Sequence, residues 1–286
     1  METLRILSWN IQWGRGRDGV VSLERIAATV RSHQPDLLCL QEVARNHPDL
    51  PGGAAGDQVA GLAALLPGFE PIYGVGSDLG DGRGGRRQFG NLILSRHPVR
   101  QAFRHLLPWP PDPAVPSMQR VAVEAVVDAS FGSLRVTTTH LEFYSARQRA
   151  AQVEALRDLH VQAHAHDRRP RSQSELDPPF AVLPRGEYAV LCGDFNCPAG
   201  AAELRRLSAP LDGAAPALVD AWTLVHPGQP HAPTAGLMPV PWLVGPDCYD
   251  FCFVSANLAP WLRNLTVDAA ADGSDHQPLI LELATP

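Results

Sequence analysis

The fold class is decided by residues 4–42, which read LRILSWNIQWGRGRDGVVSLERIAATVRSHQPDLLCLQE. The apolar run at 4–9 predicts a buried strand. After a glycine-rich turn, apolar residues recur at the spacing of one helix face: Leu23, Ile26, Ala27 and Val30. Ser22 stands before them as the expected N-cap, and Pro35 ends the helix. Because residues 36–41 predict the next strand, the segment favours an α/β fold with helices packed outside the sheet.

Further apolar segments predict the rest of the strands. They lie at 91–95, 120–127, 134–139, 188–192, 250–254 and 279–283. Some of them alternate, with Val121, Val123, Ala125 and Val127 on one face, so we expect a mixture of parallel and antiparallel strands. A second long helix is predicted at about 146–160, with Ser145 as its N-cap.

We expect the whole chain, 1–286, to form a single domain. Two proline-rich stretches, 165–187 and 226–247, are predicted to be loop insertions. Neither stretch divides the predicted strands into two self-sufficient cores. One α/β unit of this length can remove about 75% of its unfolded surface from water.

Composition excludes several classes of protein. Hydrophobic residues make up 45% of the chain and charged residues 19%, so intrinsic disorder is disfavoured. The formal net charge of −6 argues against a protein that binds duplex nucleic acid over a broad basic surface. No apolar run approaches the ~18 residues of a membrane span. The first residues also lack the pattern of a secretory signal, and we expect a cytoplasmic protein.

The five cysteines are predicted to be structural. Cys39 and Cys192 lie in or at the end of apolar runs, where a thiol behaves as a small hydrophobic group. The spacings from Cys192 to Cys197 and from Cys248 to Cys252 do not match those of zinc ribbons.

Asn, Asp, Glu and His residues recur where the predicted strands begin or end. They are Asn10, Glu42, His140, Asp194, Asn196, Asp250, Asp275 and His276. In layered α/β folds, the ligand site opens at the ends of the strands. Each residue alone is more typical of a turn or of a structural contact than of catalysis. Their recurrence at strand after strand is what indicates a site.

Several of these side chains suit the hydrolysis of a phosphate ester, in which water attacks a phosphorus atom shielded by negative oxygens. Asn10, Glu42 and Asp275 offer the amide and carboxylate oxygens that a hard divalent cation prefers. Such a cation neutralises charge on the phosphate and stabilises the leaving oxygen. The attacking water needs a group that orients or deprotonates it, and Asp194 is the candidate.

The histidines of the set complete this chemistry. His140 and His276 can donate hydrogen bonds to phosphate oxygens as charge develops on them. Asp250 can hold His276 in one tautomer and orientation. The set therefore predicts a metal-assisted phosphoester hydrolase.

Seven short motifs follow one another along the chain. They are Trp9-Asn10-Ile11-Gln12, Leu40-Gln41-Glu42-Val43, Gly90-Asn91-Leu92-Ile93-Leu94-Ser95-Arg96, Thr139-His140-Leu141, Gly193-Asp194-Phe195-Asn196, Asp220-Ala221-Trp222 and Ser274-Asp275-His276. In this order, over positions 9–276, the chain resembles the endonuclease/exonuclease/phosphatase superfamily, which has the deoxyribonuclease I-like fold. The resemblance implies a four-layer α/β/β/α sandwich, with two mixed sheets flanked by helices, and a divalent metal, usually Mg²⁺ or Mn²⁺.

The resemblance also implies metal-binding and water-positioning roles at matching positions. Glu42 resembles the principal metal ligand, with Asn10 and Asp275 close to it. Asp194 and Asn196 resemble the pair that positions the water and the phosphate. The motifs do not say whether one or two metal ions bind.

Further roles follow for the histidines and their neighbours. His276 resembles the active-site histidine backed by Asp250, and His140 resembles the second histidine. Arg120 resembles an arginine that supports the site. Deoxyribonuclease I pairs its first histidine with a carboxylate that has no clear counterpart here. Asn91 stands in for that group, and we place Asn91 with Arg120 on the substrate side.

Three other features have two interpretations each. The Gly/Arg-rich segment 78–91 is either a mobile lip, whose Arg83, Arg86 and Arg87 meet a substrate phosphate, or a solvated hairpin tip; it lacks the signature of a phosphate-binding loop. Trp109 and Trp242 lie among prolines, either as stacking platforms or as loop anchors.

We therefore expect a Mg²⁺- or Mn²⁺-dependent hydrolase of phosphodiester, or phosphomonoester, bonds. The first alternative is a non-specific or structure-specific nuclease acting on DNA or RNA, favoured by the arginines and disfavoured by the acidic balance. A less favoured alternative is an inactive binding module on the same fold. The loss of Glu42, Asp194 or His276 would indicate such a module, and all three are present.

Overall fold

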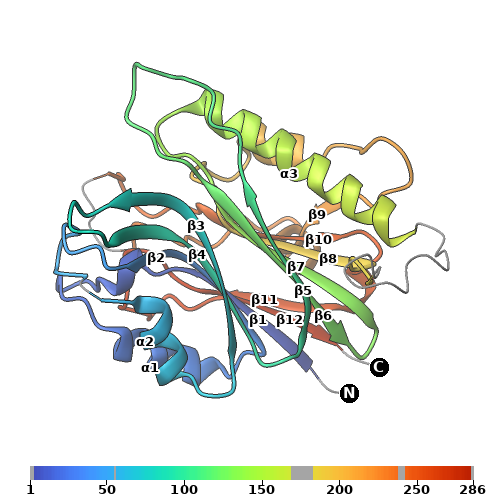
Figure 1. The fold of residues 1–286 in the computed structure, drawn as a ribbon. Helices are drawn as coiled ribbons and strands as arrows, with labels where there is room; N and C mark the ends of the chain where they lie inside the picture. Colours follow the sequence, from blue (N-terminus) through green and yellow to red (C-terminus); the bar gives the residue numbers. More distant parts are fainter. Residues whose placement is uncertain (1–2, 55, 169–182, 238–241, 285–286) are drawn as a thin grey trace, which may run out of the picture.

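The computed structural model describes residues 3–54, 56–168, 183–237 and 242–284, which form two six-stranded β-sheets packed face to face (Figure 1). The first sheet comprises, in spatial order, β11 (Leu262–Val267), β12 (Leu279–Ala284), β1 (Thr3–Asn10), β2 (Leu37–Arg45), β4 (Arg86–Ser95) and β3 (Glu70–Gly80). The second comprises β5 (Val99–Leu106), β6 (Val121–Ala129), β7 (Gly132–His140), β8 (Tyr188–Asp194), β10 (Asp250–Ser255) and β9 (Leu218–Asp220). Both sheets are mixed: β1 pairs with β2, and β7 with β8, in parallel, and the other pairs are antiparallel.

Helices cover the outer faces of both sheets. Against the first sheet lie α1 (Leu23–His33) and α2 (Gln58–Leu65), and α3 (Ala146–Asp167) runs across the second (Figure 1). The short helix α4 (Ala202–Leu207) contacts α3. The short helix α5 (Ala221–Val225) contacts β10 and β11, and the 3₁₀ turn η3 (Ala259–Trp261) packs against the core between the sheets. The arrangement is the four-layer α/β/β/α sandwich that the motifs imply, so the predicted fold class is confirmed.

The apolar runs of the central strands are continuous because both faces of each sheet are buried. In β1 and β2, Ile6 and Cys39 point into the space between the sheets, whereas Trp9 and Leu40 pack under α1 and α2. The expected caps are present: Ser22 and Ser145 accept backbone hydrogen bonds at the starts of α1 and α3.

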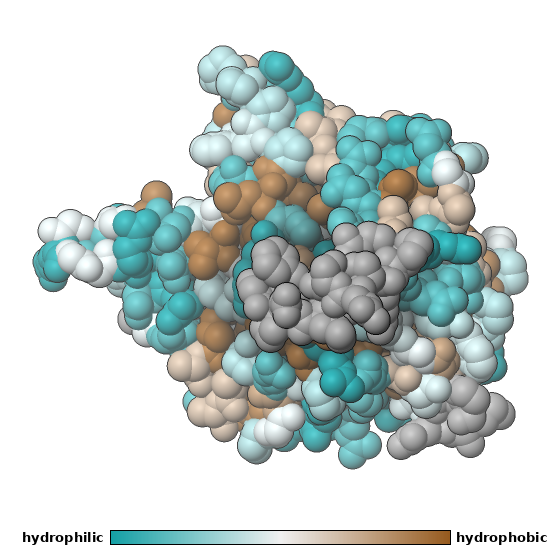
Figure 2. Space-filling view, turned by 45° about the vertical axis from the view of Figure 1, so that its right-hand side comes forward, coloured by the Kyte–Doolittle hydropathy of each residue, from teal (hydrophilic) through white to brown (hydrophobic). Residues whose placement is uncertain are grey.

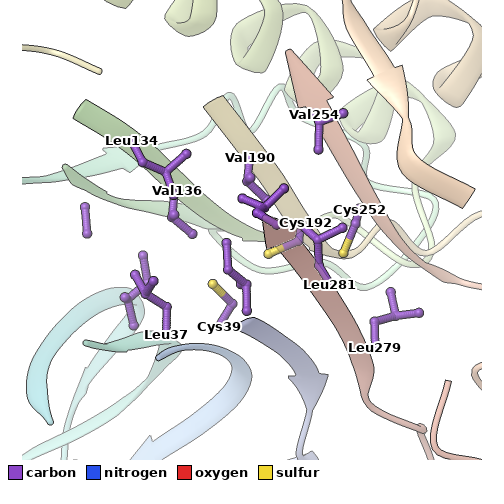
Figure 3. Packing of buried hydrophobic residues seen from close by; sticks show 14 of the residues in the cluster. Leu37, Cys39, Leu134, Val136, Val190, Cys192, Cys252, Val254, Leu279 and Leu281 are labelled. Carbon is purple, nitrogen blue, oxygen red and sulfur yellow. The ribbon is translucent and has the colours of Figure 1, made fainter. Parts of the chain in front are cut away.

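The core between the sheets contains three of the five cysteines. Cys39 of the first sheet, and Cys192 and Cys252 of the second, lie among valine and leucine side chains (Figure 3). All five cysteines are buried and free, as the sequence predicts. They act here as small apolar packing groups.

Several elements differ from the sequence prediction. Residues 78–91 are mostly two strand ends rather than a loop, since β3 extends to Gly80 and β4 begins at Arg86. The residues between them form the tip of a hairpin. The sequence pattern does not predict strands β3, β5, β9 and β11. For β5 and β11 the reason is that they are half-exposed and carry polar residues along their length. Helix α3 extends to Asp167, past its predicted end and into the expected insertion at 165–187, most of which lies outside the described residues.

One face of the molecule is shown in Figure 2. On the face in Figure 2, hydrophilic residues predominate, and hydrophobic ones form smaller clusters between them. No helix in the described part of the chain is long and apolar enough to cross a membrane.

Candidate active site

The candidate site forms where neighbouring strands of the two sheets end. Asn10 is the last residue of β1, and Glu42 lies in the adjacent strand β2. His140 and Asp194 are paired directly across β7 and β8, and Asp250 is paired with Asp194 across β10. The strand register thus brings together residues that lie far apart in the sequence. Asp275 and His276 approach them from the segment before β12.

Backbone strain accompanies this convergence. Glu42 has a φ of 58°, and the register of β2 with β4 shifts between Leu40 and Val43. Asn196 has a φ of 51° in the turn after β8. Left-handed backbone is costly for residues other than glycine and persists only where the surroundings hold it. The bulge re-aims the Glu42 carboxylate toward Asn10, which donates to it over 3.0 Å.

The Asn10 amide joins the two sheets. Its Nδ2 donates to Glu42 Oε1 and to Asp194 Oδ2, both at 3.0 Å. Its Oδ1 accepts a hydrogen bond from the backbone N–H of Gln12 at 3.1 Å. The nitrogen, rather than the oxygen, therefore faces the carboxylates. Ligation of a cation through the Asn10 oxygen requires this amide to rotate.

The carboxylates at the floor of the site share a confined space. Burial, followed by the charges of Asp275 and Asp194, raises the pKa of Glu42 to about 7. Burial, together with the charge of Asp250, raises the pKa of Asp194 to about 6. Charged carboxylates that are held together in this way are stabilised by a cation.

The two histidines have opposite electrostatics. Burial alone would lower the pKa of His276, but the carboxylates of Asp250 and Asp194 outweigh it and raise this pKa well above its ordinary value. His276 Nδ1 lies 2.8 Å from Asp250 Oδ2, so the charged imidazole donates to that carboxylate. Burial, and then the charges of Arg120 and His276, hold the pKa of His140 well below its ordinary value. His276 is therefore the cationic imidazole and His140 the neutral one.

Both imidazoles face Asp194. His140 Nε2 is 3.5 Å from Asp194 Oδ2 and 4.0 Å from Glu42 Oε1. His276 Nε2 is 3.8 Å from the same Asp194 oxygen. Asp194 is thus the central group of the site, with Asn10 and both histidines around it.

Two groups of side chains are candidates for holding a metal ion. Ligand atoms of Asp194, Asp250 and His276 lie within 4.8 Å of one another. In that group, however, His276 Nδ1 is already hydrogen-bonded to Asp250 Oδ2, so this nitrogen is not free to bind a metal ion. Glu42 and Asp194 offer carboxylate oxygens bridged only by the Asn10 amide, and this donor set fits a hard divalent cation better. The residues present therefore fit the metal that the motifs imply.

Asp275 is the third predicted ligand, and neutral donors hold it. Its Oδ2 accepts from Gln12 Nε2 at 2.8 Å and from Trp242 Nε1 at 3.2 Å. The ring of Trp242 also stacks on His276, with centroids 5.6 Å apart and planes 20° from parallel. Trp242 therefore packs on His276, as neither a free stacking platform nor a simple loop anchor.

The predicted substrate-side residues have different surroundings. Arg120 lines the cavity, and its guanidinium donates to the fully buried Glu142 at 3.1 Å. Asn91 is buried outside the lining of that cavity and donates to the carbonyl oxygen of Val121 at 2.8 Å. This bond joins β4 to β6, so the geometry does not favour the predicted substrate contact of Asn91. Asn196 lines the cavity and donates to the carbonyl oxygen of Leu141.

Two of the three arginines of the hairpin form ion pairs away from the cavity. Arg86 pairs with Asp78 at 2.8 Å within the hairpin, and Arg87 pairs with Asp49. These ion pairs favour the solvated hairpin for the tip of the 78–91 segment, whereas Phe89, in β4, lines the cavity.

A cavity of about 360 Å³ opens above these groups. Its lining consists of Gln12, Trp13, Glu42, Phe89, Met118, Arg120, His140, Phe143, Tyr144, Asp194, Asn196, Trp242, Asp275 and His276. Gln12 belongs to the first motif, but the sequence pattern assigned it no role, and Glu142 and the aromatic lining residues other than Trp242 were not proposed for the site. Glu142 stands two residues after His140, so proximity to a motif was its only signal.

Fold and site together define a class of α/β sandwich proteins with carboxylates and imidazoles gathered where strands of the two sheets end. The chain belongs to the endonuclease/exonuclease/phosphatase family, whose model matches residues 7–276. Members of this family are phosphoester hydrolases and generally depend on a divalent metal. No curated protein matches the chain.

Solved structures share the fold. An endonuclease/exonuclease/phosphatase from Beutenbergia cavernae is 26% identical, with a TM-score of 0.71, covering 100% of this chain and 72% of that one. Danio rerio TDP2 in complex with a single-stranded DNA product is 20% identical, with a TM-score of 0.63 and full coverage of both chains. A mannosyl-6-phosphatase from Bacteroides thetaiotaomicron is 16% identical, with a TM-score of 0.63, covering 98% of this chain and 99% of that one.

Proposed function

We propose that this protein is a Mg²⁺- or Mn²⁺-dependent phosphodiesterase that hydrolyses its substrate by in-line attack of an activated water. The observation that carries the proposal is the convergence of Glu42, Asp194 and His276, from separate parts of the chain, on one cavity. A divalent cation bound at these carboxylates would neutralise the phosphate and stabilise the leaving oxygen.

The chain's own residues supply the other functions. Asp194 accepts a proton from the attacking water, whose oxygen bonds to phosphorus as the bond to the leaving oxygen breaks. The cationic His276 donates to a phosphate oxygen and is held in position by Asp250. Asn196 contributes an amide beside the same position.

The assignment of residues is tested with bis(p-nitrophenyl) phosphate in the presence of Mg²⁺ or Mn²⁺. Asp194→Ala and His276→Ala are each expected to lose roughly 100-fold or more in kcat, because each removes a group that acts on the reacting atoms. Addition of a chelator is expected to abolish turnover, and re-addition of the metal to restore it. Turnover that survives the chelator would remove the metal from the mechanism, and variants with wild-type rates would refute the roles of the two residues.

A nuclease remains the second candidate, since one fold neighbour holds a DNA product. The substrate panel therefore includes plasmid and single-stranded DNA. Nuclease binding should weaken steeply with added salt, because phosphate contacts release counterions. Intact plasmid and intact single strands would reject this candidate, whereas any measured turnover would reject the inactive binding module.

The expected cytoplasmic location agrees with five free cysteines, since a reducing compartment keeps thiols unpaired.

A further inference from the structure

The cavity above the reacting groups is aromatic rather than cationic. Six of its lining residues are aromatic or thioether side chains: Trp13, Phe89, Met118, Phe143, Tyr144 and Trp242. Its one arginine, Arg120, is buried and paired with Glu142. Among the described lining residues, the parts of a substrate that extend from the phosphate therefore meet rings rather than unpaired guanidinium or ammonium groups.

The aromatic residues of the cavity form two groups. Phe143 contacts Tyr144 and Trp242 edge to face, with centroids 4.8 Å and 5.9 Å away. Trp242 already stacks on His276 and donates to Asp275. The second group is Trp13 with Phe89, whose centroids are 6.3 Å apart and whose planes are tilted by 56°. Trp13 lies in the 3₁₀ turn η1 (Gln12–Gly14), which follows β1, and Phe89 lies in β4, so both rings come from the side of the first sheet.

The backbone at Trp13 is strained. Gln12 and Trp13 have successive positive φ values of 43° and 46°. Each such residue costs free energy and persists only where its surroundings hold it. Three hydrogen bonds do so: Gly14 N–H donates to Ile11 O, Gln58 Nε2 donates to Trp13 O, and Trp13 Nε1 donates to Pro51 O.

The kink places two side chains in the cavity at once. It directs the Gln12 amide to Asp275 and leaves the Trp13 ring in the lining. The strain and its compensating hydrogen bonds thus place Trp13 at a defined position beside the reacting groups. Strain held in this manner is typical of functional sites.

We propose that Trp13 and Phe89 form a subsite for a planar ring on the ester group that is not cleaved. The inference rests on the proposed phosphodiesterase function. It names the substrate class as phosphodiesters whose retained arm carries an aryl group or a nucleobase. Rings of either kind stack on aromatic side chains.

The test compares diesters that share one leaving group, p-nitrophenolate, and differ in the retained arm. The arms are methyl in methyl p-nitrophenyl phosphate, aryl in bis(p-nitrophenyl) phosphate, and a nucleoside in thymidine 5′-(p-nitrophenyl phosphate). The wild type is expected to show kcat/KM at least about 10-fold higher for a ring-bearing arm than for methyl, a factor equivalent to about 1.4 kcal/mol. The difference between the aryl and thymidine arms tells which ring the subsite prefers.

Each variant is judged by the ratio of its kcat/KM for a ring-bearing ester to its kcat/KM for the methyl ester. Because the same esters are used for every variant, differences in their intrinsic reactivity do not affect the comparison. Phe89→Leu keeps an apolar side chain but removes the ring, and Trp13→Ala removes the indole ring. Both variants are expected to lose most of the preference for the ring-bearing esters. Trp13→Phe should restore part of it. Trp109→Ala is the control, since Trp109 is an exposed tryptophan outside the cavity lining. An unchanged ratio in both Phe89→Leu and Trp13→Ala would overturn the subsite, as would a ratio that falls only in Tyr144→Ala.

A binding measurement separates the subsite from the proposed function. In titration calorimetry, diphenyl phosphate is expected to bind the wild type at least about 10-fold more tightly than dimethyl phosphate, and Trp13→Ala is expected to lose that preference. If no diester is hydrolysed, the proposed function fails, while this preference still decides whether the ring subsite exists. Equal affinities for the two phosphates would refute the subsite even in an active enzyme.

Discussion

At the scale of single residues, Asp250 shows how one side chain is prepared for its neighbour. Its backbone N–H and that of Tyr249 both donate to Thr234 Oγ1, which fixes the start of β10. Its Oδ2 then accepts from His276 Nδ1 at 2.8 Å. The Asp250 carboxylate is buried, so its charge acts on His276 with little screening by water. The orientation and the charge of His276 therefore both depend on Asp250.

Asp250→Asn should lower kcat for bis(p-nitrophenyl) phosphate by roughly 10- to 100-fold, because the amide keeps the shape but removes the charge that stabilises the imidazolium. Steady-state kinetics with saturating metal measure this change. Asp128→Asn is the matched control, since Asp128 lies near the end of β6 and forms an exposed ion pair with Arg100. An Asp250→Asn enzyme within twofold of the wild type would contradict the positioning role.

A glycine at the end of β8 shows a second residue-scale constraint. Gly193 precedes Asp194 and has a φ of 141°. A Cβ atom built on it would lie 1.9 Å from the carbonyl oxygen of Thr139, on the neighbouring strand β7. The close approach of these two strands is what pairs His140 with Asp194. Only a residue without a side chain fits at this position.

Gly193→Ala should destabilise the fold by about 3 kcal/mol or more, since it combines a backbone clash with an unfavourable φ. Urea denaturation followed by circular dichroism gives the free energy of unfolding. Gly213→Ala serves as the comparison, because Gly213 also has a positive φ but has open space where its Cβ would lie. If the two variants lose the same stability, the clash with Thr139 is not the cause.

At the scale of elements, α3 is anchored on the second sheet by buried polar contacts as well as apolar ones. Arg135 of β7 donates to Nδ1 of His160, at 2.6 Å, and His160 Nε2 donates to the carbonyl oxygen of Pro216 at 2.8 Å. Both contacts require a neutral imidazole, with its proton on Nε2. Burial, followed by the charge of Arg135, lowers the pKa of His160 from 6.5 to about 4.

The stability of this contact should therefore fall in acid. His160 has a lower pKa in the folded protein than in the unfolded chain, so the unfolded chain binds a proton first as the pH falls below 6.5. Between about pH 7 and pH 5, this single group should cost about 2 kcal/mol of unfolding free energy. In His160→Gln, whose amide can make both hydrogen bonds without titrating, the loss over this range should be smaller by that amount.

Urea denaturation at the two pH values measures the difference. His166→Gln is the control, because His166 is exposed near the end of the same helix. An acid response in His160→Gln equal to that of the wild type would show that other groups are responsible.

At the scale of the whole molecule, the candidate metal site joins the two sheets. Glu42 belongs to the first sheet and Asp194 to the second, and the Asn10 amide bridges them. A cation held by both carboxylates would bind the folded protein and not the unfolded chain, so it would raise the stability of the whole sandwich.

Saturating Mg²⁺ or Mn²⁺ should raise the melting temperature by about 5 °C, because a ligand at 100 times its Kd adds about 2.7 kcal/mol. Differential scanning fluorimetry with and without chelator measures this rise. Glu42→Gln should abolish it, whereas Glu187→Gln, at an exposed position, should retain it. A full metal-induced rise in Glu42→Gln would place the cation elsewhere.

Much of this architecture could be predicted from the sequence, for an identifiable reason. The central strands are buried on both faces, so they are marked by apolar runs, as at residues 4–9. Ser145 and the inward Leu156 marked the start and the inner face of α3. Edge and half-exposed strands such as β5 and β11 carry no such mark, because their polar residues face solvent. The order of the motifs also predicted which residues to examine, including Glu42, Asp194 and His276.

The apolar periodicity, the helix caps and the identity of the reactive side chains follow from the sequence alone, because these are local properties of the chain. The folded arrangement is what turns the Asn10 nitrogen toward the carboxylates, stacks Trp242 on His276 and joins β4 to β6 through Asn91. Such contacts join residues far apart in the sequence, and strand register and sheet packing set their distances. No local pattern records those distances.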